Sequence, residues 1–201
     1  MARKAGVDGM TETRSTIETI WTLPNILTIT RIVLIPLFLI LLLDGMHSEA
    51  LGVFALGGLT DAFDGAIARR TKQKTVLGSY LDPLADKLLI MSSYVTLAAL
   101  GFLPVWLAVL VLSRDFVIIL GYGVIFVAVQ QKMEVRPSRL GKLNTVLQIV
   151  TVLLILLELS GAPLRRALIF FYVLTAATTV ASGLHYIHQG MLWFQHRTAS
   201  P

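Results

Sequence analysis

Residues 61–87 read DAFDGAIARRTKQKTVLGSYLDPLADK and carry two pairs of aspartates on either side of a short basic segment. Successive residues of an α-helix are rotated by about 100°, so Asp61 and Asp64 lie about 60° apart on one helix face. Asp82 and Asp86 are four residues apart and also share a face. Two antiparallel helices joined by a short connection pack as neighbours. We therefore expect the two carboxylate pairs to converge in one cavity.

Small residues accompany the first pair of aspartates. At about 100° per residue, Gly65 and Ala68 lie within about 40° of Asp61, which leaves space for a bulky ligand close to the backbone. Arg69, at the end of the same helix, can bind a phosphate through two parallel hydrogen bonds. The alternative is a purely structural role, in which ion pairs such as Asp86 with Arg69 hold a helix bundle together. Four acidic residues in two same-face pairs favour the ligand site.

The charge of four converging carboxylates predicts a cation site. Such carboxylates repel one another and become partly protonated unless cations neutralise them. Ligand sets made only of oxygen suit hard divalent ions, Mg²⁺ or Mn²⁺, which usually keep positions open for substrate phosphates. Two ions about 3.5–4 Å apart stabilise both the attacking and the leaving oxygen in phosphoryl transfer. The residues therefore indicate phosphoryl transfer with two divalent cations.

The composition is typical of an integral membrane protein. Of the 201 residues, 55% are hydrophobic and 14% are charged, whereas soluble domains contain about 25% charged residues. The chain contains no cysteine, which excludes a disulfide framework, a thiolate nucleophile and a Cys-ligated zinc. A membrane-spanning helix needs about 20 mostly apolar residues. Several runs, including residues 23–43 and 143–159, meet this requirement.

The pattern predicts an all-α fold, a bundle of six transmembrane helices that forms one domain over residues 23–190. Residues 1–22 are expected to be a cytoplasmic tail with a short N-terminal interfacial helix, because Ser15 and Glu18 fit a capping box. Residues 191–201 are expected to be a C-terminal tail. Pro83 is expected near the start of the third span, where its missing N–H has little effect. The six spans are predicted at Leu23–Leu43, Glu49–Arg69, Ser79–Gly101, Pro104–Val129, Lys142–Ser160 and Arg166–His188.

The distribution of positive charge predicts the orientation in the membrane. Twelve Lys and Arg residues lie in the two termini and the second and fourth connections, whereas Arg165 and Arg166 lie on the opposite side. Both termini should therefore face the cytoplasm of a bacterial inner membrane, or the matrix if the membrane is the mitochondrial inner membrane. The net charge of +5 favours anionic lipid headgroups as partners. Nucleic acid is not expected, because the basic residues flank helices.

The aspartates belong to a longer pattern of eight residues at fixed spacing, Asp61-x2-Asp64-Gly65-x2-Ala68-Arg69-x8-Gly78-x3-Asp82-x3-Asp86. This pattern matches, without a departure, the signature of the CDP-alcohol phosphotransferases, and the chain resembles that family. The resemblance extends from Pro24-Asn25-x2-Thr28-x2-Arg31 through Ser113-Arg114-Asp115 to about Gln148. It implies a six-helix fold, usually homodimeric, and transfer of a phosphatidyl group from CDP-diacylglycerol to an alcohol, with release of CMP.

The resemblance also implies roles for individual residues. Four aspartates would hold two divalent cations, Mg²⁺ or Mn²⁺, and the last would take the acceptor's proton as general base. A second group would bind CDP-diacylglycerol. By position, the metal ligands are Asp61, Asp64, Asp82 and Asp86, the catalytic base is Asp86, and the CDP-diacylglycerol-binding residues are Asn25, Thr28, Gly65, Ala68, Arg69, Thr75 and Gly78.

Four further polar residues are candidates for binding the acceptor alcohol: Arg114, Arg139, Lys142 and Asn144. Each taken alone is explained equally well as an interfacial cation or a helix-cap partner. Family members that use glycerol 3-phosphate tend to carry Gly-Lys-x-Lys-Thr where this chain reads GKLNT at 141–145. The missing lysine favours a singly charged acceptor, phosphatidylglycerol, and the resemblance is greatest to the CMP-forming cardiolipin synthases of the family. Phosphatidylglycerophosphate synthases are the alternative.

Two other classes of protein also use intramembrane aspartates. An intramembrane prenyltransferase binds Mg²⁺ through two Asp-rich motifs, but this chain has one such cluster. A cation transporter lines its path with carboxylates, but Gly65, Ala68 and Arg69 would then have no role. His185 and His188 are spaced as a metal-binding pair on a helix, and interfacial anchoring explains them better because no third ligand is evident.

Overall fold

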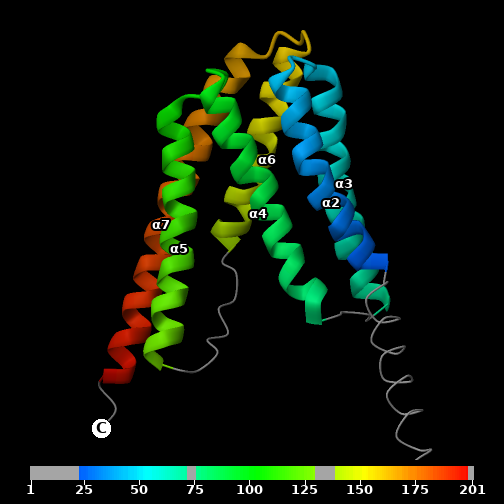
Figure 1. The fold of residues 1–201 in the computed structure, drawn as a ribbon. Coiled ribbons are helices and arrows are strands. Elements are labelled where there is room, and N and C mark those ends of the chain that lie inside the picture. Colours follow the sequence, from blue (N-terminus) through cyan, green and yellow to red (C-terminus); the bar gives the residue numbers. More distant parts are fainter. Residues whose placement is uncertain (1–22, 72–75, 130–138, 199–201) are drawn as a thin grey trace, which may run out of the picture. The chain divides into compact units, whose positions relative to one another are not determined.

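The computed structural model describes residues 23–71, 76–129 and 139–198, with side chains described in 29–60, 87–121, 139–189 and at Met191. Within these residues the protein is all-helical, as predicted, and contains no strand (Figure 1). The predicted N-terminal interfacial helix lies outside the described residues. The chain forms two compact units, residues 1–92 and 93–201, which divide within α4. The helices are α2 (Leu23–Leu43), α3 (His47–Thr71), α4 (Val76–Ala99), α5 (Val105–Val129), α6 (Arg139–Leu159) and α7 (Arg165–Thr198).

The helix boundaries agree with prediction for α2 and differ for the others. Helix α4 begins at Val76, so Pro83 is its eighth residue. The prediction that Pro83 lies near the start of this helix was therefore wrong. Because proline has no N–H, the Ser79 carbonyl loses its usual partner four residues later. Helix α7 continues ten residues past His188, to Thr198. Apolar patterning marks the part of a helix that a membrane would cover, whereas the helix ends where its backbone hydrogen bonds end.

Three helices are each followed, two residues after their last residue, by a glycine in the left-handed backbone region. At the end of α4, Gly101 has a φ of 78°, and the Phe102 N–H donates to the Leu97 carbonyl at 2.9 Å. This backbone arrangement is a Schellman motif, which satisfies carbonyls at the helix end and turns the chain sharply. The same arrangement ends α2 at Gly45 (φ 75°) and α6 at Gly161 (φ 105°).

The turn geometry predicts opposite effects for one substitution at two glycines. Gly101→Ala should destabilise the protein by about 1–2 kcal/mol, because an L-residue is strained at positive φ. Gly121→Ala, inside α5, should stabilise it by about 0.5–1 kcal/mol, because a Cβ there has no atom within 4 Å. Thermal unfolding of the purified proteins in one detergent measures both. Shifts of the same sign would contradict the assignment of the turn.

Each unit has its own apolar core. In the first unit α2 packs against α3, where the rings of Phe38 and Phe54 lie 5.5 Å apart and both side chains are buried. In the second unit α7 packs against both α5 and α6. Leu107 and Val111 of α5 and Ile155 of α6 are almost completely buried there. Helix α7 therefore connects the polar residues of α5 and α6 that are described below.

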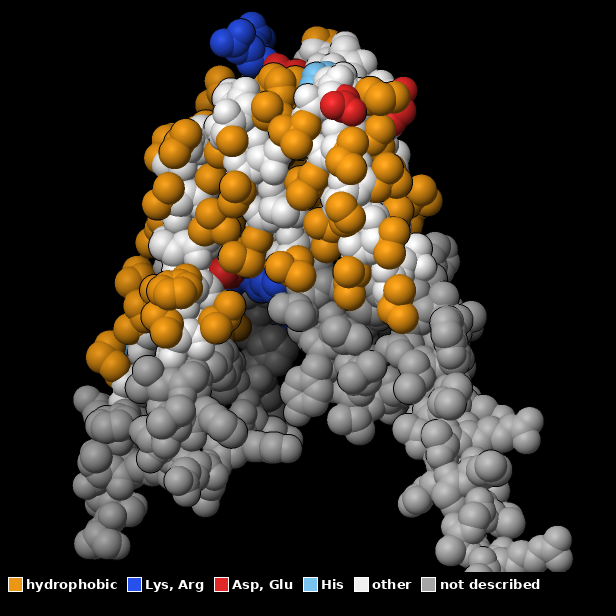
Figure 2. All heavy atoms as spheres, in the orientation of Figure 1, with side chains coloured by type: hydrophobic (Ala, Val, Ile, Leu, Met, Phe, Trp, Pro, Cys, Tyr) orange, Lys and Arg blue, Asp and Glu red, His pale blue; other side chains and the backbone are white. Residues whose placement is uncertain are grey.

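On the face shown in Figure 2, the surface of the described residues is largely apolar. Val33, Val105 and Phe170 each expose more than 60% of their surface, which is unusual for a protein surrounded by water. Two described helical segments, Arg139–Leu159 and Arg165–Gln189, are long and apolar enough to cross a membrane. Both findings fit a membrane protein. The remaining four spans stay predictions.

Candidate active site

The aspartate motif lies on two continuous helices, on α3 and on the part of α4 that belongs to the first unit. Asp61 and Asp64 belong to α3, and Asp82 and Asp86 belong to α4, so their spacings of three and four residues are helical spacings. Their side chains lie outside the described set. The same holds for the other predicted ligand-binding positions in the helices, which are Asn25 and Thr28 in α2, Gly65, Ala68 and Arg69 in α3, and Gly78 in α4. Thr75 lies in the connection outside the described residues.

A side chain of α4 reaches α3 beside the motif. A Cβ built on Gly57 of α3 would lie 3.2 Å from the Leu89 Cδ2 of α4, which is tighter than nearly all real Cβ contacts. Both residues are buried. Gly57 comes four residues before Asp61, and Leu89 comes three residues after Asp86. The absence of a side chain at Gly57 thus leaves room for the Leu89 side chain, about one helical turn from a carboxylate of each helix.

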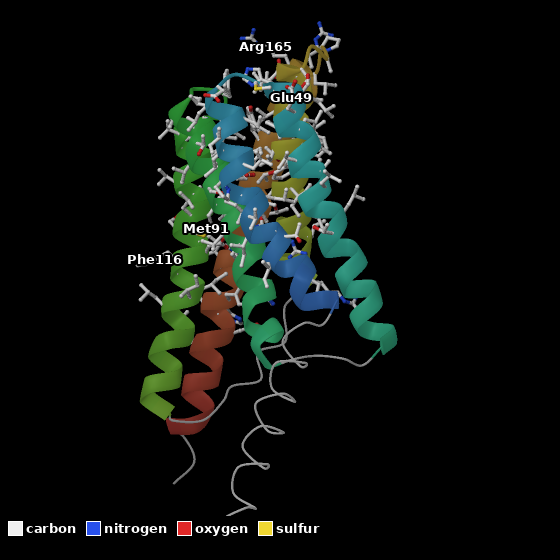
Figure 3. All side chains as sticks on the ribbon, turned by 45° about the vertical axis from the view of Figure 1, so that its right-hand side comes forward. Glu49, Met91, Phe116 and Arg165 are labelled. Atoms are coloured by element: carbon white, nitrogen blue, oxygen red, sulfur yellow. The ribbon has the colours of Figure 1, made fainter. Side chains whose placement is uncertain are left out.

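The second unit contains an arginine whose side chain is largely shielded from solvent and contacts α7. The Arg114 guanidinium donates to Asp115 Oδ1 at 2.7 Å and to Ser182 Oγ at 2.6 Å. It also lies 5.5 Å from the ring centroid of Tyr186, within cation–π range. By contrast, Phe116 points away from α5 and is 60% exposed (Figure 3). The chain therefore directs Arg114 toward α7.

The other three acceptor candidates lie in the first turns of α6. Arg139 and Lys142 are exposed, whereas Asn144 is completely buried. The hydroxyl oxygens of Thr179 and Thr178 lie 2.8 and 3.0 Å from Asn144 Oδ1. Arg114 and Asn144 thus both contact α7, at residues about one helical turn apart. Arg139 and Lys142 lie on the exposed side of α6.

Additional polar contacts hold the second unit together. The Thr151 and Thr175 hydroxyls lie 2.9 Å apart between α6 and α7, and the Tyr94 hydroxyl donates to the Gln148 carbonyl at 3.4 Å. These side chains are buried. Such interhelical bonds contribute about 0.6 kcal/mol on average within a membrane. They join helices, and nothing in their geometry requires a ligand.

No role was predicted for Ser182, Thr179 or Tyr186, although all three contact predicted site residues. Their spacing carries a signal. Together with Thr175, these polar residues recur every three to four positions along α7 and so form a stripe on one helix face. The sequence alone does not say which helix this stripe faces. The contacts to Arg114 and Asn144 answer that question.

The chemistry of the aspartate motif suits divalent cations. Its four carboxylates offer only oxygen donors, which Mg²⁺ and Mn²⁺ prefer. Among the described residues no group of three His, Asp or Glu side chains is arranged to hold a metal. His185 and His188 are among these described residues, whereas the side chains of the motif are not. The motif therefore remains the candidate metal centre.

The helices of the described residues and the two aspartate pairs at helical spacing are the features that the sequence resemblance predicts. Residues 21–184 match the model of the CDP-alcohol phosphatidyltransferase family. The protein belongs to this family. The matched region contains the whole aspartate motif, Arg114, and α6 and most of the polar stripe of α7.

Named relatives fall into two groups. "Cardiolipin synthase (CMP-forming)" of Rattus norvegicus is 37% identical over 195 residues, and that of Homo sapiens is 36% identical over 201 residues. These alignments cover 88% and 90% of this chain but 64% and 66% of the relatives, so the chain spans slightly less than two thirds of their length. "Probable phosphatidylglycerophosphate synthase" of Mycobacterium tuberculosis is 39% identical over 175 residues, covering 84% of this chain and 81% of the relative.

Proposed function

We propose that this protein transfers the phosphatidyl group of CDP-diacylglycerol to phosphatidylglycerol, which produces cardiolipin and CMP. The observation that carries the proposal is the aspartate motif on α3 and α4, complete at every family position. The choice of phosphatidylglycerol as acceptor rests on Asn144 and on the names of the rat and human relatives.

The contact between Gly57 and Leu89 supports convergence of the carboxylates. Asp64 lies seven residues after Gly57, and Asp82 lies seven residues before Leu89. If the antiparallel pairing continues from this contact, Asp64 is level with Asp82 and Asp61 is within one residue of the level of Asp86. Each aspartate of one pair is then at or near the level of an aspartate of the other pair. Such an arrangement suits two cations side by side.

In the proposed reaction an acceptor hydroxyl attacks the phosphorus of the phosphatidyl group. The new P–O bond forms as the bond to the CMP phosphate oxygen breaks, and CMP leaves with that electron pair. Asp86 accepts the hydroxyl proton. Arg69, together with Asn25 and Thr28, binds the cytidine diphosphate moiety. The small residues Gly65 and Ala68 let this moiety approach the backbone of α3, as Gly78 does on α4, and Thr75 adds a hydroxyl contact.

The proposal includes two divalent cations, Mg²⁺ or Mn²⁺, bound by Asp61, Asp64, Asp82 and Asp86. Bound there, they would neutralise the charge on the pyrophosphate and lower the pKa of the acceptor hydroxyl. A carboxylate beside cations is normally a weak base. Asp86 can still serve, because an acceptor hydroxyl made more acidic needs only a weak base.

We further propose that all six helices span the membrane, with the aspartates near the cytoplasmic or matrix surface. The exposed apolar residues of the described helices support a lipid environment. The excess of Lys and Arg at the termini and at two connections supports the orientation. The family resemblance also suggests a homodimer as the functional form.

Charge supports phosphatidylglycerol over glycerol 3-phosphate. Asn144 occupies the position of the second lysine in the fifth-helix motif, so the acceptor site lacks one cation for a doubly charged phosphate. The surroundings of Asn144 also fit a neutral residue, since it is buried and its Oδ1 lies near the Thr178 and Thr179 hydroxyls. A lysine there would remove the Asn144 acceptor from both hydroxyls, although the Thr178 hydroxyl also lies within hydrogen-bond distance of the Leu174 and Thr175 carbonyls. Arg114, Arg139 and Lys142 remain to bind a singly charged phosphodiester.

A direct acceptor comparison tests the proposed function. With CDP-diacylglycerol as donor, purified protein should form cardiolipin from phosphatidylglycerol about 10- to 100-fold faster than it forms phosphatidylglycerophosphate. This range corresponds to one charge-assisted hydrogen bond of about 1.5–3 kcal/mol. Chromatography of the lipid products and measurement of released CMP check it at matched acceptor concentrations.

The second candidate function is phosphatidylglycerophosphate synthesis. It is favoured by the Mycobacterium tuberculosis relative, 81% of whose length is covered, and by "CDP-diacylglycerol--glycerol-3-phosphate 3-phosphatidyltransferase" of Bacillus subtilis, 32% identical over 151 residues. Faster reaction with glycerol 3-phosphate in the same assay would establish this candidate and exclude the first.

A further inference from the structure

Arg114 is held from several sides by residues with no assigned role. Its guanidinium contacts Asp115 and Ser182, and its aliphatic stem lies against Gly183, where an added Cβ would be 3.6 Å from Arg114 Cγ. The Tyr186 ring covers the guanidinium at 5.5 Å. These contacts leave Arg114 little rotational freedom. Three of these four residues come from one stretch of α7.

The burial of this cluster strengthens the electrostatic interaction between Arg114 and Asp115. The Arg114 side chain is 8% exposed and that of Asp115 is 1% exposed. A bonded pair in such apolar surroundings is screened little by solvent, so Asp115 cancels much of the positive potential of Arg114 at a distance. One donor is still available for a ligand, because Arg114 Nε is buried without a partner among the described residues. Arg114 thus offers directed hydrogen bonding with a reduced net charge.

We propose that Asp115 and Ser182 determine the charge class of the acceptor by acting on Arg114. Ser182 is a positioning residue that fixes the guanidinium, and Asp115 lowers its effective charge. A site of this kind favours a singly charged phosphodiester over a doubly charged phosphomonoester, because the dianion gains less from Arg114 and is repelled more by Asp115. The inference rests on the proposed function, since it takes the ligand of Arg114 to be the acceptor phosphate.

The first test is Asp115→Asn, which removes the carboxylate charge and keeps the side-chain volume. The ratio of kcat/KM for glycerol 3-phosphate to kcat/KM for phosphatidylglycerol should rise about tenfold, and the KM for CDP-diacylglycerol should not change. Thr151→Val is the control, because it also removes a buried polar contact to α7 but lies outside the cluster. An unchanged ratio in folded Asp115→Asn protein, or an equal rise in Thr151→Val, overturns the proposal.

Asp115→Asn leaves a buried arginine unpaired and so risks misfolding. In that case variants of Ser182 test the proposal, because Ser182→Ala keeps the ion pair between Arg114 and Asp115. Ser182→Ala should raise the KM of both acceptors about five- to tenfold while the KM for CDP-diacylglycerol stays constant, and Ser182→Thr should restore the acceptor KM values. Unchanged acceptor KM values, or an equal rise in the donor KM, overturn the positioning role.

The outcome can be separated from that of the proposed function. If the wild-type protein prefers glycerol 3-phosphate, the proposed acceptor is wrong. The inference about Asp115 is still tested by the direction in which Asp115→Asn moves the acceptor ratio. A rise supports it whichever acceptor the wild-type protein prefers, and a fall overturns it.

Discussion

Replacement of any one motif aspartate is expected to lower turnover about 1000-fold or more while the protein remains folded. The four variants are Asp61→Asn, Asp64→Asn, Asp82→Asn and Asp86→Asn. Removal of a general base alone lowers rates by about 10²–10⁴-fold. Loss of a ligand between two cations should be at least as damaging, because charge at the pyrophosphate is no longer neutralised. Release of CMP from CDP-diacylglycerol measures the activity, and gel filtration with thermal unfolding measures folding.

Asp44→Asn is the matched control for this series. Asp44 belongs to the same unit but lies exposed in the turn between α2 and α3, outside the motif. Its replacement should leave CMP release within about twofold of wild type, because surface substitutions have small effects. Two of the four motif variants with activity near wild type would rule out the two-cation arrangement. Loss of folding in the motif variants would instead assign the aspartates a structural role.

The sequence predicted the helical elements well where composition and turn chemistry agree. The bounds of α2 are as predicted, because its apolar run ends at Asp44-Gly45, a strong helix-stop signal. The end of α7 was predicted ten residues too early. Residues 189–198 are less uniformly apolar than the span before them but contain no proline, so nothing stops the helix. Hydropathy reports on the surrounding solvent and contains little information about helix length.

The sequence revealed those site residues whose burial in an apolar helix costs much free energy, and it did not reveal the others. Aspartates within apolar helices are costly, so they are conspicuous in the sequence. Arg114 was found by the same reasoning. Ser182 and Thr179 were not found, because hydroxyl side chains cost little free energy inside helices and occur there without function. Their importance comes from contacts with Arg114 and Asn144, across more than 30 residues of sequence, which helical periodicity does not specify.

The second large effect is expected at Gly57 of α3, beside which the Leu89 side chain of α4 lies. Gly57→Leu should lower kcat/KM about 100-fold, because the new side chain collides with Leu89 and moves apart the helices that carry the two aspartate pairs. A displacement of about 1 Å in a catalytic site has an effect of this size. The adjacent Gly58→Leu is the control, since a Cβ there meets no atom within 4 Å. It should remain within about threefold of wild type.

A compensating change separates helix spacing from general damage. Leu89→Ala removes the atoms that a side chain at position 57 would strike. If spacing is the cause, Gly57→Leu combined with Leu89→Ala should be at least about tenfold more active than Gly57→Leu alone, although the single change at Leu89 is itself destabilising. Such non-additivity is the signature of two residues in direct contact. Additive losses in the double variant would mean that the contact does not set the distance between the carboxylates.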